Sequence, residues 1–237
     1  MRHPLVKLLI AGATAVVLAC GDSSGPGPRT VALFTNPNFV DYDTSDIYSE
    51  ASQWDFTLAH LGATVTPFTG IDSAGLASIL STNGALVIPT TGGFALDDSL
   101  TAAAAGVIRD FVDSLGGLLV LSTDNVSFAL LDSLWGYQLA YGGSLNYYPL
   151  NTSDAAGTPF GGGPVRVWDN DGTQITAAAS FPAAAKLIYA TGTDVALAVI
   201  PQGNGTVVLL GWNLEAALPH GPQDGGWIEA LRRMLRL

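Results

Sequence analysis

The chain has 237 residues, of which 9 are basic and 20 are acidic, and its formal net charge is −11. Hydrophobic residues make up 48% and charged residues only 12%, which excludes a disordered chain and allows a sizeable buried core. The acidic balance excludes nucleic-acid binding because such a surface repels phosphate backbones, and the single cysteine excludes a disulfide framework and a multi-cysteine zinc site.

The first 28 residues predict a secretory signal followed by a tether. Two basic residues precede an apolar run over 8–18, which is too short to span a bilayer as a helix. The run ends at Cys20, and the junction resembles a bacterial lipoprotein signal, in which the cysteine is acylated. A plain signal peptide with a chance cysteine is the alternative. We expect a signal peptide over 1–19 and a lipidated Cys20 with a flexible linker over 20–28.

The lipoprotein resemblance implies a location and a chemical restriction. Gly21, rather than Asp, follows the cysteine, which in such lipoproteins favours the outer membrane. We therefore expect a protein of the bacterial cell envelope whose acylated Cys20 inserts into the lipid membrane. With Cys20 consumed by lipid, the mature chain has no thiol for nucleophilic catalysis. It keeps seven basic residues against 20 acidic ones, a charge of −13.

Residues 29–135 predict strands and helices in strict alternation. Apolar runs predict strands over 29–36, 63–68, 85–89 and 118–121, and helical spacing or capping predicts helices over 45–61, 72–80, 97–115 and 127–135. Short buried strands with helical connections predict a parallel sheet that is covered on both faces.

The C-terminal half changes in texture. Residues 136–185 are rich in Gly, Asn, Pro and Asp and predict an irregular insertion with a short strand at 165–168. Three more strands and a final helix are predicted at 186–190, 195–200, 206–210 and 226–235. Consecutive strands that are joined by only a few residues must be antiparallel, because a parallel connection needs a longer crossover. Residues 29–237 therefore predict one α/β domain, a flavodoxin-like three-layer parallel sheet with an antiparallel extension near the C-terminus.

Three segments resemble class I glutamine amidotransferase-like domains, most closely the trehalose-utilisation-type group. Pro89–Gly93 resembles the glycine loop that supplies oxyanion-hole amides, and Gly117–Asp124 resembles the strand that leads into the nucleophile elbow. Gly205–Trp212 resembles the strand that delivers the catalytic histidine. The resemblance implies the fold of that group for most of residues 29–237.

The catalytic residues of the amidotransferases are absent from these segments. Thr123 and Asp124 stand where the family has a cysteine flanked by glycines, and the strand that ends at Gly211 is followed by no histidine until the loop residue His220. A Cys-His triad cannot be written for this chain, so glutaminase activity is not carried over from the family.

Five residues near the carboxyl ends of the predicted strands are candidates for a site. Thr123 is either a nucleophile activated by His220 or part of the cap of the following helix, which is the interpretation we favour. Asp124 is an acid or base without an identifiable partner. We expect the backbone amides of Gly92 and Gly93 to line a shallow ligand pocket beside Thr123 and Asp124.

The loop after the first strand carries Asp41, Asp43 and Asp46, whose oxygens at alternate positions are typical of calcium ligands. The register does not match an EF-hand, since Asp46 stands where glycine is required. Helix capping is the interpretation that we favour, and neither a metal nor a cofactor is predicted.

Aromatic residues gather in the irregular half, at Trp135, Tyr137, Tyr141, Tyr147, Tyr148, Phe160 and Trp168. They either contact a sugar or a protein partner or form a small core of the insertion. The first functional hypothesis is an envelope-anchored, non-catalytic domain that binds a small molecule, a glycan or an envelope protein at the carboxyl edge of its sheet. The alternative is a hydrolase of a carbohydrate or ester that uses Thr123 or Asp124 with His220.

Overall fold

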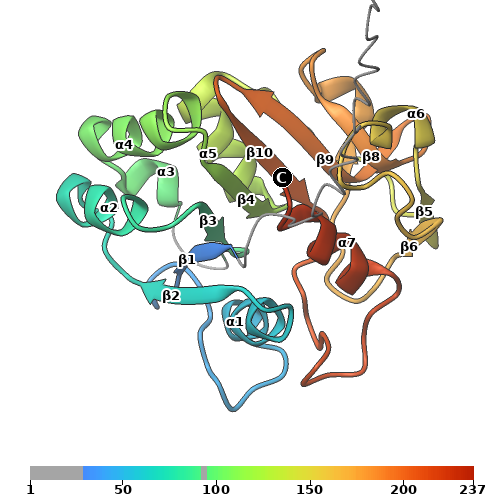
Figure 1. The fold of residues 1–237 in the computed structure, drawn as a ribbon, viewed down its shortest axis with the longest axis horizontal. Helices are drawn as coiled ribbons and strands as arrows, with labels where there is room; N and C mark the ends of the chain where they lie inside the picture. Colours follow the sequence, from blue (N-terminus) through green and yellow to red (C-terminus); the bar gives the residue numbers. More distant parts are fainter. Residues whose placement is uncertain (1–28, 92–94) are drawn as a thin grey trace, which may run out of the picture.

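One eight-stranded sheet runs through the computed structural model, which describes residues 29–91 and 95–237 (Figure 1). Its order is β2-β1-β3-β4-β10-β9-β7, and β8 also pairs with β9. The strands are β1 (Thr30–Phe34), β2 (Thr64–Phe68), β3 (Ala85–Ile88), β4 (Leu118–Ser122), β7 (Thr176–Ala177), β8 (Lys186–Ala190), β9 (Asp194–Gln202) and β10 (Gly205–Leu210). The first four and β10 run parallel, and β9 is antiparallel to β10, β7 and β8. The flavodoxin-like fold with a C-terminal antiparallel extension is confirmed.

Helices cover both faces of this sheet. They are α1 (Glu50–His60), α2 (Ser73–Leu80), α3 (Leu96–Ser99), α4 (Ala102–Asp113), α5 (Asn125–Trp135), α6 (Thr152–Ala155), the 3-10 helix η1 (Ala178–Ser180) and α7 (Trp227–Met234). Successive side chains of β1 point to opposite faces of the sheet and so pack against different helices. Val31 and Leu33 pack with α1 and α7, whereas Ala32 and Phe34 pack with α2, α4 and α5.

Two helix predictions were wrong, one by a break inside the helix and one at its start, and polar side chains explain both. The helix expected over 97–115 is divided into α3 and α4, because Thr101 is extended and its hydroxyl accepts from the Ala104 N–H at 3.2 Å as a new N-cap. The helix expected from Ser45 begins only at Glu50. Asp43 accepts from the Ser45 N–H and Asp46 from the Tyr48 N–H, and these bonds hold the preceding residues in turns.

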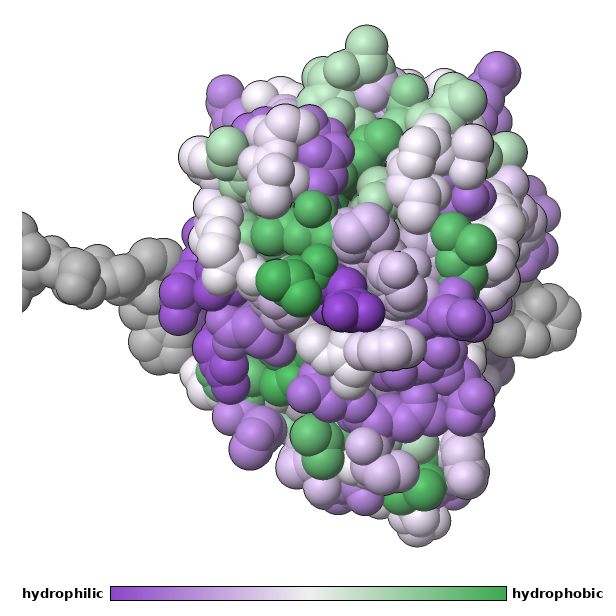
Figure 2. Space-filling model, turned by 90° about the vertical axis from the view of Figure 1, so that its right-hand side faces the viewer, coloured by the Kyte–Doolittle hydropathy of each residue, from purple (hydrophilic) through white to green (hydrophobic). Residues whose placement is uncertain are grey.

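The insertion over 136–185 contains a strand pair that was only half predicted. β6 (Arg166–Trp168) pairs with β5 (Tyr147–Pro149), which the sequence pattern did not reveal. Tyr148 is completely buried in the core, whereas Tyr147 and Trp168 are each nearly half exposed. On the face that Figure 2 shows, apolar side chains lie in small separate groups among hydrophilic ones.

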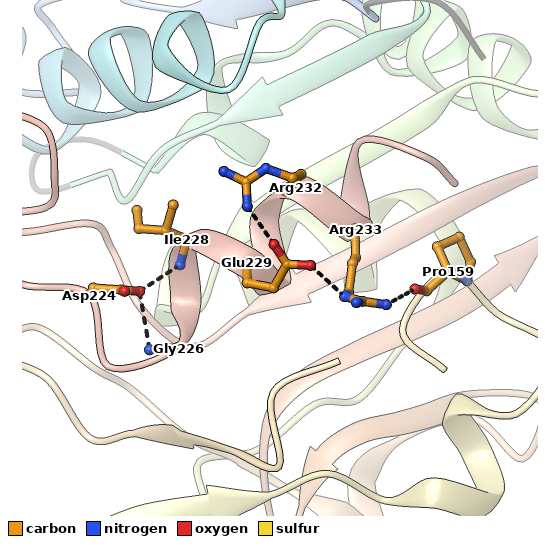
Figure 3. Close-up of polar contacts among 7 residues, drawn as sticks. All are labelled: Pro159, Asp224, Gly226, Ile228, Glu229, Arg232 and Arg233. Carbon is orange, nitrogen blue, oxygen red and sulfur yellow. Dashed lines mark hydrogen bonds and ion pairs between the residues drawn. The ribbon is translucent and has the colours of Figure 1, made fainter. Parts of the chain in front are cut away.

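The last helix ties the insertion to the sheet (Figure 3). Asp224 accepts from the N–H groups of Gly226 and Ile228 and so caps α7. Glu229 pairs with Arg232 and, at 2.9 Å, with Arg233, whose guanidinium also donates to the Pro159 carbonyl. These are the ion pairs of the part of the chain that the structure describes.

Some predictions fall on residues whose structure is not described. The signal peptide, Cys20 and the linker all precede Arg29, and Gly92 and Gly93 lie in the gap after Thr91. Within the two described stretches, no helix has the length and apolar character that a membrane crossing requires.

Candidate functional site

Polar residues from three parallel strands and one helix meet at the carboxyl edge of the sheet. Thr90 follows β3, Asp124 follows β4 and Asn213 follows β10, while Glu50 is the first residue of α1. Ligands favour this edge in open α/β sheets. The edge therefore places four side chains that are far apart in the sequence around one point.

Glu50 is the centre of this group. The Asn213 side-chain amide donates to its carboxylate, and the Asn213 amide is itself oriented because its oxygen accepts from the Glu215 N–H at 3.0 Å. Helix α1 is fixed to the sheet by the indole of Trp54, which donates to the Ser122 hydroxyl at 3.2 Å. The carboxylate of Glu50 is thus held from two sides, by its helix and by its hydrogen-bond partner.

Burial raises the pKa of Glu50 from an ordinary 4.5 to about 7. The carboxylates of Asp124 and Glu215 raise this pKa further, while hydrogen bonding from Asn213 and the nearness of the Thr90 hydroxyl oppose the rise. The burial effect is the largest of these. Glu50 is therefore a group that changes charge close to neutral pH.

A cavity of about 480 Å³ opens beside Glu50. Its wall comprises Glu50, Thr90 and the loop after β1, namely Pro37, Asn38, Phe39, Val40, Asp41, Tyr42 and Tyr48. The loop is held in place by the Tyr42 hydroxyl, which donates to Asp55, and by the Ser49 hydroxyl, which donates to the Asp41 carbonyl. The volume lies within the usual range for small-molecule sites.

The Asp124 carboxylate accepts hydrogen bonds from backbone N–H groups and does not line the cavity beside Glu50. One carboxylate oxygen accepts from the Ser127 N–H and completes a capping box at the start of α5, and the other accepts from the Thr91 N–H at 2.9 Å. Asp124 is only 3% exposed, and burial raises its pKa despite these hydrogen bonds. The loop after β3 therefore lies beside the turn after β4, as the parallel pairing predicts. The prediction that the backbone amides of Gly92 and Gly93 line a ligand pocket concerns residues outside the described part of the chain.

Thr123 and His220 occupy different surroundings. Thr123 is buried, and its N–H donates to the Leu210 carbonyl, so its backbone belongs to the junction of β4 and β10. Its backbone and that of Asp124 are not among the positions with positive φ, and Asp124 is extended at φ −154°. His220 is exposed and stacks on Phe56 of α1 at a centroid distance of 3.8 Å. Within residues 29–91 and 95–237, no hydrogen bond joins His220 to Thr123 or Asp124.

Asp43 and Asp46 accept hydrogen bonds from residues of their own loop. Asp43 accepts from the backbone and the hydroxyl of Ser45, and Asp46 accepts from the Tyr48 N–H. In the described ranges, no three side chains of the His, Cys, Asp and Glu types are grouped so that they would hold a metal ion.

Glu50 and Asn213 were missed at the level of sequence. They are 163 positions apart, and the family resemblance predicts a histidine at the end of β10, whereas the residue that reaches the site there is Asn213. The usable signal was a polar residue two or three positions after the end of β3, β4 and β10, because these residues meet at one edge.

Comparison with known proteins finds similar solved structures alone. No family model and no curated protein matches this chain. A ThuA-like protein from Bacteroides uniformis has a TM-score of 0.49 at 12% identity, with 89% of both chains covered. The exo-β-1,4-mannosidase Op5Man5 from Opitutaceae bacterium strain TAV5 has a TM-score of 0.47 at 13% identity, and the match covers 81% of this chain but 32% of the mannosidase.

Proposed function

We propose that this chain binds a small polar ligand in the cavity beside Glu50 and does so without amidotransferase chemistry. The observation that carries the proposal is the juxtaposition of a largely buried carboxylate, held by Asn213, with a cavity of about 480 Å³ at the carboxyl edge of the sheet. Burial of the Glu50 carboxylate costs free energy in the unliganded protein. A ligand that donates a hydrogen bond to this carboxylate would offset that cost.

The chemistry of the wall defines the ligand class. Asp41, Glu50 and the amide of Asn38 offer hydrogen-bonding groups, and Phe39 and Tyr48 offer apolar ring surface. None of the described residues that line the cavity is basic, so an anionic ligand has no partner there. The ligand is therefore uncharged or positively charged.

The proposed setting is the bacterial envelope. The basic start, the apolar run and the position of Cys20 support a lipid anchor, and the linker over 20–28 would let the domain extend from the membrane surface. This part of the proposal rests on the sequence pattern alone.

A thermal-shift screen of small polar compounds on the purified chain tests the binding proposal, because a ligand of the native state raises the melting temperature. Tyr48→Ala removes an exposed aromatic from the cavity wall, and Tyr147→Ala removes another exposed one, from β5. The proposal expects hits that Tyr48→Ala weakens and Tyr147→Ala does not. Hits that are the same in all three proteins, or none in the wild type, contradict it.

The hydrolase alternative has less support from the geometry. The Asp124 carboxylate is engaged by two backbone N–H groups, and His220 stacks on Phe56. Hydrolysis of a carbohydrate or ester substrate that is lost in both Thr123→Ala and His220→Ala would place this alternative first.

A further inference from the structure

The cavity wall has a charge as well as a shape. Asp41 and Glu50 both line it, and neither forms an ion pair with a described residue. The sequence around them strengthens the effect, since no Lys or Arg occurs between Arg29 and Arg109. The same stretch carries acidic residues at Asp41, Asp43, Asp46, Glu50, Asp55, Asp72, Asp97 and Asp98. Asp41 and Glu50, with no basic residue beside them on the described wall, therefore give the cavity a negative potential.

The wall also contains groups that suit a compact cation. Tyr42 and Tyr48 contribute aromatic rings beside the carboxylates, and aromatic faces attract ammonium groups through their quadrupole. The Thr90 hydroxyl oxygen is buried at the wall, close enough to the Glu50 carboxylate to lower the pKa of that group. Its lone pairs can still accept from an N–H or O–H group of a ligand.

We propose that the cavity binds an organic cation, an ammonium group on a small alkyl or hydroxyalkyl body, which Glu50 and Asp41 neutralise and the tyrosine rings contact. This inference rests on the proposed function and specifies its ligand. The charge of the cation replaces the proton that Glu50 otherwise holds, so binding releases a proton and tightens as the pH rises.

The groups that face Glu50 are all acidic or neutral. Asp124 approaches from the end of β4, Glu215 from the loop after β10 and Asp41 from the loop after β1. The described histidines, His60 and His220, are both exposed, and His220 stacks on Phe56. His220→Gln is therefore the control for a titration that does not belong to Glu50.

The test is calorimetric titration of the full chain, purified in a mild non-ionic detergent, with choline and with 3,3-dimethyl-1-butanol, its uncharged counterpart of the same shape. Choline should bind, and the alcohol should bind at least tenfold more weakly. Choline affinity should increase about tenfold from pH 6 to pH 8, since the carboxylate form of Glu50 grows by that factor.

Three variants complete the design. Glu50→Gln should weaken choline binding and remove its pH dependence, Asp41→Asn should weaken it and keep the pH dependence, and His220→Gln should behave as the wild type. Equal binding of choline and the alcohol, or a pH dependence that survives Glu50→Gln, overturns the inference.

Sorbitol serves as the neutral probe that separates this inference from the proposed function. Binding of sorbitol that depends on Tyr48, with choline silent, overturns the cation inference and leaves the ligand-binding proposal standing. If neither probe binds and the wider thermal-shift screen also gives no hit that depends on Tyr48, both fail.

Discussion

Replacing Glu50 by glutamine should make the folded protein more stable at neutral and alkaline pH. The carboxyl has a pKa of about 7 in the folded chain and an ordinary value of 4.5 when it is solvated. Between these values the unfolded chain has released the proton and the folded chain still holds it, so the native state binds more protons. The free energy of unfolding therefore falls as the pH rises through this window and stays low above it.

The size of the effect follows from the two pKa values. At 1.36 kcal/mol per pH unit, Glu50 lowers the free energy of unfolding by about 2.5 kcal/mol more at pH 8 than at pH 5. Glu50→Gln removes this titration and retains an oxygen that accepts from the Asn213 amide. The variant should thus lose that part of the pH dependence.

Urea denaturation at pH 5 and pH 8 measures the difference. The control is Asp98→Asn, which removes an exposed carboxyl from α3. The wild type and Asp98→Asn should lose about 2.5 kcal/mol more than Glu50→Gln between the two pH values. Parallel pH profiles for the wild type and Glu50→Gln would refute the argument.

Three further substitutions probe the surroundings of the site and the anchor. Gly172→Ala should destabilise the chain by roughly 1–3 kcal/mol more than Gly162→Ala in urea, because both glycines have a φ of +74° but only a Cβ at Gly172 would overlap the Asn213 amide; equal losses would contradict this. Asp124→Ala should cost about 2 kcal/mol, since it removes the cap of α5 and leaves the buried Thr91 N–H without its partner, while Thr101→Ala removes only the cap of α4 and should cost about 1 kcal/mol. Reversal of that order would show that the Asp124 contacts contribute little. Cys20→Ser should move the protein out of the membrane fraction or leave its signal uncleaved, and normal processing with unchanged membrane association would refute the lipid anchor.

The sequence pattern predicted the sheet well because its strands are continuous apolar runs. Lys186–Ala190 was predicted with both ends correct, and the four parallel strands of the first half were placed within one or two residues of their ends. β5 was missed because Tyr147–Pro149 is short, contains a proline and alternates poorly with its neighbours. The division of the helix at Thr101 was missed because the apolar spacing continues across the break and hides the cap.

The site was harder to predict because its parts meet only in three dimensions. Asp124 as a helix cap follows from local spacing to Ser127, and that kind of signal is visible in a sequence. The raised pKa of Glu50 depends on burial and on the carboxylates of Asp124 after β4 and Glu215 after β10, so no local pattern reveals it. The resemblance to amidotransferases predicts a histidine after β10, whereas the site residue that follows this strand is Asn213.

The most direct measurement is a titration of the glutamate carboxyl groups by carbon-13 NMR on the chain labelled at glutamate. The sequence contains three glutamates, Glu50, Glu215 and Glu229, so the spectrum is simple and each signal can be assigned by substitution to glutamine. Glu229 should titrate below its ordinary range because Arg232 and Arg233 pair with it, and Glu50 should titrate near pH 7. Saturating choline should lower the Glu50 midpoint and leave the Glu229 midpoint unchanged. If Glu50 instead titrates near 4.5 and does not respond to choline or to any ligand from the screen, the site described around it is not the functional site of this protein.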